Sequence, residues 1–176
     1  DFMDILKYAK GILENGFPSG VLMIDDGWSP YYGKWQFRGD NFRDPKGMIR
    51  ELHEMGFSVM LWICPFITPD TVEFREARDK HFLIETPEGK PRILEWWNGY
   101  SAALDLTNPD AMKWLKDQLD VLMDMGVDGF RLDAVKEYVT GSVEDNVEIL
   151  SWFADYVHGK DPENYLVCEC WTDQNT

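Results

Sequence analysis

The stretch Val127-Asp128-Gly129-Phe130-Arg131-Leu132-Asp133 decides the fold class, because a short apolar strand pattern here follows directly on a strong helix pattern. The helix pattern opens at Asn108-Pro109, with a capping side chain and a proline at the first helical position, and ends before Gly126. A helix that leads straight into a continuous apolar strand is typical of sheets whose strands are parallel and buried on both faces. We therefore expect an α/β fold.

The same alternation of helix and strand patterns runs along the whole chain. Strand patterns cover 20–24, 57–64, 102–106, 127–134 and 165–171, and helix patterns cover 2–15, 45–55, 69–80, 109–125 and 144–158. Residues 81–101 form a long excursion with a hairpin-like turn at Thr86-Pro87-Glu88-Gly89. Right-handed crossovers between such strands leave two architectures, a barrel or a doubly wound sheet.

Two features favour the barrel. Polar and aromatic residues follow the carboxyl ends of the predicted strands, where barrels place their active sites, and the sequence has no Gly-x-Gly-x-x-Gly turn for a dinucleotide. The prediction is a partial (β/α)8 TIM barrel with about five parallel strands. Five strands do not close an eight-stranded barrel, so residues 1–176 are interpreted as a single segment of an incomplete catalytic domain. Its open edges could support self-association.

Composition excludes several classes of partner. The net charge of −15 repels phosphate backbones and anionic lipid surfaces, so neither nucleic acid nor a membrane is expected as a partner, whereas a neutral carbohydrate is compatible with it. The three cysteines, Cys64, Cys168 and Cys170, do not form a disulfide framework or a metal-ligand spacing. They are interpreted as buried free thiols, which together with the lack of a signal peptide favours a cytoplasmic location. No cofactor or metal is expected.

Asp133 is the first candidate for catalysis. It ends a buried strand, and because residues two apart on a strand point the same way, Arg131 shares its face. A guanidinium beside a carboxylate lowers the pKa of that carboxylate and keeps it ionised, as a nucleophile requires. The alternative is an inward ion pair that only fills the barrel.

Glu169 is the second candidate. It lies in the predicted strand Tyr165-Leu166-Val167-Cys168-Glu169-Cys170-Trp171, where burial would raise its pKa and suit it to donate a proton. If its strand neighbours that of Asp133, the carboxyl groups could approach the ~5 Å spacing of retaining glycosidases. A Glu that faces outward or joins a structural salt bridge is the alternative.

Four further residues are candidates for sugar binding. Asp25 and Asp26 end the first strand, and only one of them can point into the barrel mouth. Asp25 is the one we expect to accept a sugar hydroxyl, and an N-cap or turn role before Gly27 is the alternative. Trp62, at the end of the second strand, could form a stacking wall or an ordinary part of the core. One of the adjacent pair Trp96-Trp97 is expected to face the site, and Trp97 is the one we assign.

Several stretches that contain these residues resemble glycoside hydrolase family 31, which includes α-glucosidases and α-xylosidases. They are Ile24-Asp25-Asp26-Gly27-Trp28, Phe42-Arg43-Asp44-Pro45-Lys46-Gly47-Met48, Leu61-Trp62-Ile63-Cys64-Pro65-Phe66, Trp96-Trp97-Asn98-Gly99-Tyr100-Ser101 and Leu104-Asp105-Leu106-Thr107-Asn108-Pro109. The resemblance spans about residues 1–134. It implies that Asp25 and Trp62 contact the sugar at the non-reducing end, that Arg131 holds a hydroxyl, and that Asp133 is the nucleophile.

Residues 127–176 instead resemble the α-amylase family, glycoside hydrolase family 13. The resemblance rests on Gly129-Phe130-Arg131-Leu132-Asp133-Ala134-Val135-Lys136, the helix around Trp152-Phe153, and Asn164 to Trp171. It implies the same nucleophile, Asp133, with Arg131 as its partner and Glu169 as general acid/base. Family 31 would take the acid from an Asp on a later strand, outside this chain.

The sequence therefore predicts a retaining α-glycoside hydrolase that acts on α-linked glucosyl-type sugars by double displacement. A catalytically incomplete carbohydrate-binding or scaffold fragment is the main alternative. A barrel aldolase or isomerase would need a Lys or His in the mouth, and Lys136 is the nearby candidate for that role.

Overall fold

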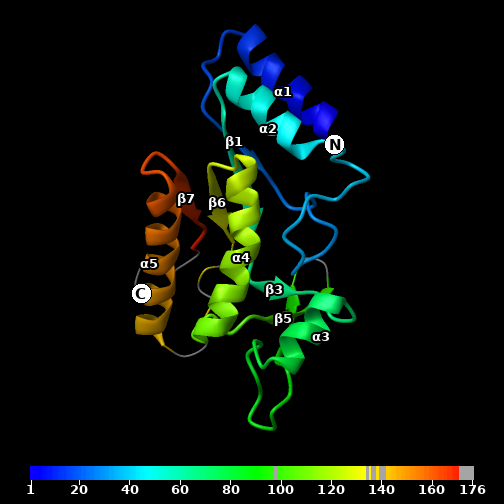
Figure 1. The fold of residues 1–176 in the computed structure, drawn as a ribbon, viewed down its shortest axis with the longest axis vertical. Helices are drawn as coiled ribbons and strands as arrows, with labels where there is room; N and C mark the ends of the chain where they lie inside the picture. The colour runs from blue at the N-terminus through cyan, green and yellow to red at the C-terminus, as the bar shows by residue number, and fades with distance from the viewer. Residues whose placement is uncertain (97–98, 134, 136–137, 139–141, 171–176) are drawn as a thin grey trace.

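The computed structural model describes residues 1–96, 99–133, 135, 138 and 142–170. Helices alternate with single strands or pairs of strands along the chain, as Figure 1 shows. The helices are α1 (Phe2–Glu14), α2 (Pro45–Glu54), α3 (Val72–Asp79), α4 (Pro109–Met125) and α5 (Val143–Lys160). The strands are β1 (Val21–Ile24), β2 (Ser58–Ile63), β3 (Phe66–Ile67), β4 (Ile93–Trp96), β5 (Gly99–Ala103), β6 (Gly129–Leu132) and β7 (Tyr165–Cys168).

A parallel sheet forms the frame of the molecule. Its strand order is β1-β2-β6-β7, and every neighbouring pair is parallel, which confirms the α/β fold class and is consistent with a partial barrel. The sheet contains four strands among the described residues, with β1 and β7 at its edges. Self-association through those edges stays a prediction.

The prediction of a fifth parallel strand at residues 102–106 is wrong. The strand at this place, β5, belongs instead to an antiparallel sheet of order β3-β5-β4. β4 and β5 are separated by only two residues, so they pair locally as a hairpin. A local pairing costs less loop-closure entropy than a parallel pairing with a distant strand, and the apolar pattern of residues 102–106 is compatible with both.

The parallel sheet has two chemically different faces. Leu22, Leu61, Phe130 and Leu132 point to one side and belong to the main hydrophobic core. That core also contains apolar residues of all five helices, so this is the helix-covered side. Met60, Trp62 and Arg131 alternate with them and point to the other side, which corresponds to the barrel interior.

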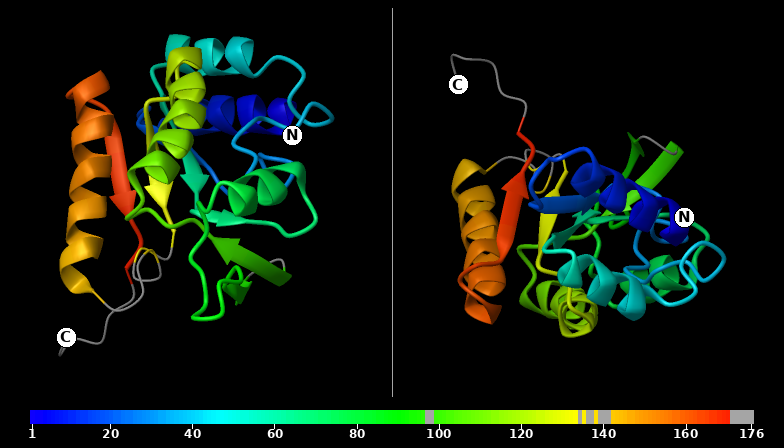
Figure 2. Two further views of the ribbon diagram at one scale, coloured as in Figure 1. Left: turned by 60° about the horizontal axis from the view of Figure 1, so that its bottom comes forward. Right: turned by 90° about the horizontal axis from the view of Figure 1, so that it is seen from above.

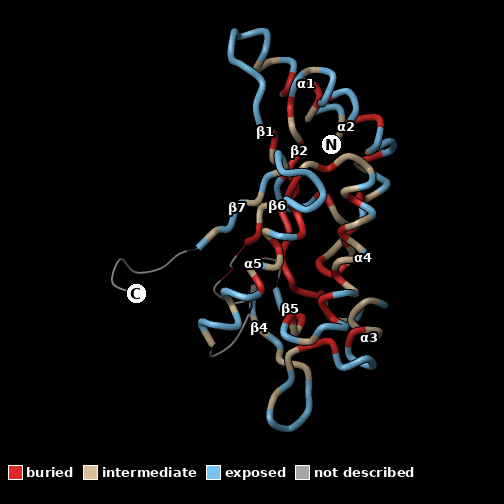
Figure 3. The backbone as a smooth tube through the Cα atoms, turned by 60° about the vertical axis from the view of Figure 1, so that its left-hand side comes forward, coloured by how far each residue is buried: buried red, intermediate tan, exposed pale blue. Residues whose placement is uncertain are grey.

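The arrangement of the helices agrees with this division. In the left view of Figure 2, α4 and α5 run alongside β6 and β7, while α1 and α2 lie together at the N-terminal end of the sheet. Figure 3 shows buried residues along β2 and β6, whereas the edge strand β7 is largely exposed. The small antiparallel sheet lies at the opposite end from α1 and α2, beyond the carboxyl ends of the parallel strands (Figure 1).

Local signals in the sequence explain where the site-bearing strand begins. Asn108 caps α4 by accepting hydrogen bonds from the Asp110 and Ala111 amides, and Gly126 ends it with φ at 114°, a left-handed conformation that favours glycine. Gly129 opens β6, where a Cβ atom would collide with the carbonyl oxygen of Tyr165 on β7. The two glycines therefore allow a short connection and a close strand pairing.

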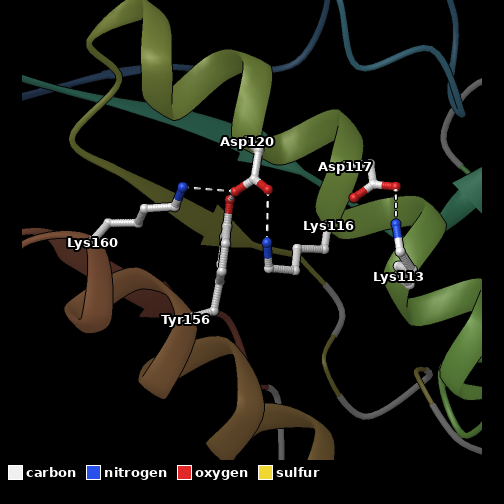
Figure 4. Close-up of polar contacts among 6 residues, drawn as sticks. All are labelled: Lys113, Lys116, Asp117, Asp120, Tyr156 and Lys160. Atoms are coloured by element: carbon white, nitrogen blue, oxygen red, sulfur yellow. Dashed lines mark hydrogen bonds and ion pairs between the residues drawn. The ribbon is translucent and has the colours of Figure 1, made fainter.

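A polar cluster on the outer side joins α4 to α5 (Figure 4). The Asp120 carboxylate accepts hydrogen bonds from Lys116 Nζ at 2.7 Å, Lys160 Nζ at 2.9 Å and Tyr156 Oη at 2.9 Å. Burial alone would raise the pKa of Asp120, but the hydrogen bonds from Lys116, Lys160 and Tyr156 outweigh it and lower that pKa to about 2. Asp120 therefore ties the two helices together through its charged form.

We expect Asp120→Asn to lower the free energy of unfolding by about 1 to 2 kcal/mol, because a buried phenol and two ammonium groups lose their charged acceptor. The matched control is Asp117→Asn. The Asp117 side chain is 53% exposed, and among the contacts drawn in Figure 4 it pairs only with Lys113, at 2.6 Å. Loss of this exposed ion pair should therefore lower the free energy of unfolding by about 0.5 kcal/mol or less. Urea unfolding measures both values, and equal losses would contradict the assignment.

The same contact predicts an acid dependence of stability. Because the folded-state pKa of Asp120 is depressed, its contribution is present above the ordinary pKa of an aspartate, about 4, and is lost as the pH falls through about 2. Wild-type protein should therefore lose more stability between pH 4 and pH 2 than Asp120→Asn does. Parallel unfolding curves of the two proteins across this range would contradict the prediction.

All three thiols are free, as predicted, and Cys64 is buried. The prediction that all are buried is wrong for Cys168 and Cys170, which are both exposed. Cys168 ends β7, a strand at the edge of the sheet, and Cys170 lies two residues beyond it. Within the described residues, no helix has both the length and the apolar character needed to cross a membrane.

Candidate active site

The carboxyl ends of β2, β6 and β7 meet at one edge of the parallel sheet. The backbone hydrogen bonds continue one residue past each strand, since the Asp133 amide donates to the Ile63 carbonyl and the Glu169 amide donates to the Leu132 carbonyl. Asp133 is therefore held beside the end of β2, and Glu169 beside the end of β6. The positions predicted from strand alternation are brought together.

Arg131 lies between the two predicted catalytic carboxylates. One guanidinium nitrogen, Nη1, is 4.0 Å from Asp133 Oδ1, and Nη2 forms an ion pair with Glu169 Oε2. Asp133 is buried, with 6% of its surface exposed, whereas Glu169 is partly exposed just after β7. Arg131 and Asp133 lie on one face, as predicted. Glu169 is partly exposed and forms an ion pair with the same guanidinium, which matches the alternative of a salt-bridged Glu rather than the expected buried position that would raise its pKa.

Asp25 and Asp26 follow β1 at the neighbouring end of the sheet, and both are exposed. The Asp25 carboxylate accepts a hydrogen bond from the Asp26 amide at 2.8 Å, which makes it a local turn contact. Asp26 Oδ1 accepts from the Gly27 amide at 2.6 Å, and Asp26 Oδ2 accepts from Tyr32 Oη at 2.7 Å. Asp26 is therefore the member of the pair that is tied to the rest of the site.

A second, smaller hydrophobic cluster supports this edge from the barrel-interior side. Its buried members are Tyr32, Trp62, Cys64, Phe66 and Ala103. The ring centroids of Tyr32 and Trp62 are 5.5 Å apart, and only 5% of Trp62 is exposed. The Trp28 indole donates a hydrogen bond to the Trp62 carbonyl at 2.7 Å, which fastens the loop after β1 to the end of β2. A stacking role for Trp62 stays a prediction.

The electrostatics of this cluster indicate that the acidic groups converge. Burial raises the pKa of the Cys64 thiol, and the negative charges of Asp26 and Asp133 raise it further. Burial also raises the pKa of Tyr32, as do its hydrogen bond to Asp26 and the charges of Asp26 and Asp133. Both carboxylates thus act on the same phenol and the same thiol, which remain protonated at neutral pH.

Tyr32, Trp28 and Cys64 were not predicted as site residues. The available signal was the aromatic composition of residues 28–35, directly after a strand that ends in two aspartates. Sequence spacing alone could not show that this loop folds back onto β2. Trp97, which was predicted to face the site, lies outside the described residues.

In the described part of the chain, no group of three or more His, Cys, Asp or Glu side chains is placed to hold a metal ion. A groove of about 440 Å³ between α4 and α5 is lined by residues such as Met112 and Trp152. It lies on the helix-covered side and contains none of the predicted site residues.

The parallel sheet has helices on one face, and acidic, cationic and aromatic side chains gather at the carboxyl ends of its strands. These features define a (β/α)-barrel segment with a polar site at the strand ends. The sequence model of the glycosyl hydrolases family 31 TIM-barrel domain matches residues 1–166. The chain belongs to this family.

Relatives with similar sequences are glycosidases. The chain is 35% identical over 134 residues to the α-xylosidase XylQ of Lactiplantibacillus pentosus, a match that covers 73% of this chain and 17% of the relative. It is also 35% identical over 132 residues to the myogenesis-regulating glycosidase of Mus musculus, covering 74% and 18% of the two chains. The chain thus spans less than a fifth of the length of these two relatives.

Solved structures support the fold. The Flavobacterium johnsoniae family 31 dextranase, solved as a D412A mutant with isomaltotriose, superimposes with a TM-score of 0.81 at 19% identity, over 96% of this chain and 24% of that chain. An α-galactosidase from Thermus thermophilus gives a TM-score of 0.78 at 24% identity, over 95% and 34%. The α-amylase resemblance of residues 127–176 is not shown by these comparisons, and the family 31 match itself extends through β6 and α5 to residue 166.

Proposed function

We propose that this chain carries the nucleophile of a retaining α-glycosidase that acts on α-linked glucosyl-type sugars. The observation that supports the proposal is the placement of Asp133: a buried carboxylate at the carboxyl end of β6, with a guanidinium nitrogen 4.0 Å away. The nearby cation favours the ionised carboxylate, which is the form that attacks an anomeric carbon.

In the proposed reaction, an Asp133 carboxylate oxygen forms a bond to the anomeric carbon while the bond to the leaving oxygen breaks. The leaving oxygen takes a proton from the acid/base, for which Glu169 is the proposed residue of this chain. Water then attacks the glycosyl-enzyme and gives its proton to the same acid/base, which releases the sugar and restores Asp133.

Substrate binding is proposed for the residues around this pair. Asp26, held by Tyr32 and Gly27, and Asp25 beside it carry acceptors for sugar hydroxyls. Trp62 provides part of the apolar wall, backed by Tyr32 and Cys64, and Trp97 is proposed as a further contact. Arg131 orients Asp133 and Glu169. Relatives of this chain include an α-xylosidase and a lysosomal α-glucosidase, so the tests of the proposal use both glucosyl and xylosyl donors.

A mechanism-based label tests the proposal directly. The 5-fluoro α-glycosyl fluorides of glucose and xylose should add one glycosyl unit to the protein, because they form the covalent intermediate faster than water removes it. Mass spectrometry of the digested protein should find the added mass on the peptide that contains Asp133. Labelling of another carboxylate, with Asp133 unmodified, would contradict the proposed mechanism.

A carbohydrate-binding segment without turnover is the second candidate function. In this case methyl α-D-glucoside or methyl α-D-xyloside would bind, as measured by tryptophan fluorescence, but the fluorinated donors would not label the protein.

A further inference from the structure

We propose that Tyr32 is a positioning residue, which holds the Asp26 carboxylate in the orientation that receives a sugar hydroxyl. The inference deepens the proposed function, since it rests on Asp26 as a sugar contact. Asp26 is exposed and lies in the loop after β1, so packing does not restrict its side chain. Its two oxygens are instead restrained separately, Oδ1 by the Gly27 amide at 2.6 Å and Oδ2 by Tyr32 Oη at 2.7 Å.

Tyr32 is itself rigidly held, although it belongs to a loop. Only 5% of the residue is exposed, and its ring packs against that of Trp62 on β2. Its carbonyl accepts a hydrogen bond from the Thr68 amide at 2.9 Å, just after β3. The next residue, Gly33, lies so close to the side chain of Ile67 that a Cβ atom would be 2.8 Å from Ile67 Cγ2. Tyr32 thus connects an exposed carboxylate to the buried part of the sheet.

The charge state of Tyr32 fits this role. A phenol can donate to a carboxylate only while it is protonated. Burial, the hydrogen bond to Asp26, and the negative charges of Asp26 and Asp133 all raise the pKa of Tyr32, so its proton is retained across the neutral range. Deletion of the hydroxyl, with the ring kept, removes the restraint on Asp26 Oδ2 and leaves only the Gly27 amide on Oδ1. A carboxylate that is held at one oxygen only is a weaker partner for one particular hydroxyl.

Tyr32→Phe is the informative substitution, and Tyr31→Phe is its matched control. The Tyr31 hydroxyl also donates to a carboxylate, Glu73 Oε2 at 3.0 Å, but on α3 rather than at the strand ends. Loss of the Tyr32 hydroxyl should raise the Kd for methyl α-D-glucoside or methyl α-D-xyloside about tenfold. Tyr31→Phe should leave the Kd within about twofold of wild type. Both variants should unfold at temperatures within a few degrees of wild type, since neither removes a ring from the core.

A double-mutant cycle separates positioning from a general effect on structure. If Tyr32 acts through Asp26, then Tyr32→Phe should have no further effect on the Kd in an Asp26→Asn background, whereas its effect should persist in an Asp25→Asn background. Full additivity with Asp26→Asn, or an unchanged Kd for Tyr32→Phe alone, would overturn the inference.

A measurement without sugar keeps the two proposals distinguishable. The ¹³C resonance of the Asp26 carboxylate, assigned by its loss in Asp26→Asn, should move in Tyr32→Phe and stay in place in Tyr31→Phe. A resonance that does not move overturns the positioning role, whatever the sugar data show. If the wild-type protein neither binds α-glycosides nor is labelled by them, the proposed function is overturned, and with it the sugar-binding role of Asp26. A shifted resonance in Tyr32→Phe would still support the restraint of Asp26 by Tyr32.

Discussion

Asp133→Asn is expected to reduce the turnover of 4-nitrophenyl α-D-glucoside or α-D-xyloside by roughly 10⁴- to 10⁶-fold, because the amide cannot form the covalent intermediate. The substitution keeps the size of the buried Asp133 side chain, so the fold should be retained. Steady-state kinetics with both donors measures the loss, and the far-ultraviolet circular dichroism spectrum should be unchanged. Turnover within tenfold of wild type would remove Asp133 from the mechanism.

The stereochemistry of a rescue reaction makes this prediction specific to a nucleophile. Asp133→Ala leaves room for a small anion on the face of the sugar that the carboxylate would attack. Sodium azide should therefore restore part of the turnover of the 4-nitrophenyl donor and yield the β-glycosyl azide, the inverted product. A merely structural role for Asp133 predicts neither rescue nor this product, and formation of the α-glycosyl azide would contradict the proposed geometry.

Glu169→Gln is expected to have the second largest effect, and the effect should depend on the leaving group. If Glu169 supplies the proton, the hydrolysis of maltose or an alkyl α-glucoside should fall roughly 10²- to 10⁴-fold, because its leaving oxygen needs protonation. Formation of the glycosyl-enzyme from a 4-nitrophenyl or fluoride donor should fall much less. Single-turnover rates with the two kinds of donor measure the difference.

The ion pair between Glu169 and Arg131 makes this experiment decisive between two roles. Arg131 is also 4.0 Å from Asp133, so Glu169 could act only by holding the arginine against the nucleophile. In that case all donors should slow by the same factor, and Glu169→Asp should recover little because the shorter side chain no longer reaches the guanidinium. An equal loss for good and poor leaving groups would assign the acid to a different residue.

β5 pairs differently from the parallel strand that its sequence predicts. The apolar pattern at residues 102–106 overlaps β5 only at residues 102 and 103, and it did not indicate the partner strand, because a short apolar run does not distinguish a parallel core strand from a hairpin strand. Pairing with β4, only two residues away in sequence, decided the outcome. By contrast, the direction of β6 was predicted correctly. The helix α4, which Asn108 caps and Gly126 ends, leads into β6, and a helical crossover of this kind places a strand parallel to its neighbours in the sheet.

Local chemistry determined much of this protein without a structure. Caps, stops and apolar periodicity located the helices and the four parallel strands, and strand alternation put Arg131 and Asp133 on one face. Only the tertiary structure decided which distant groups meet. The contacts of Glu169 with Arg131 and of Tyr32 with Asp26 depend on strand order and on a loop folding back over β2. These arrangements are set by the packing of non-local elements, for which sequence spacing carries no signal.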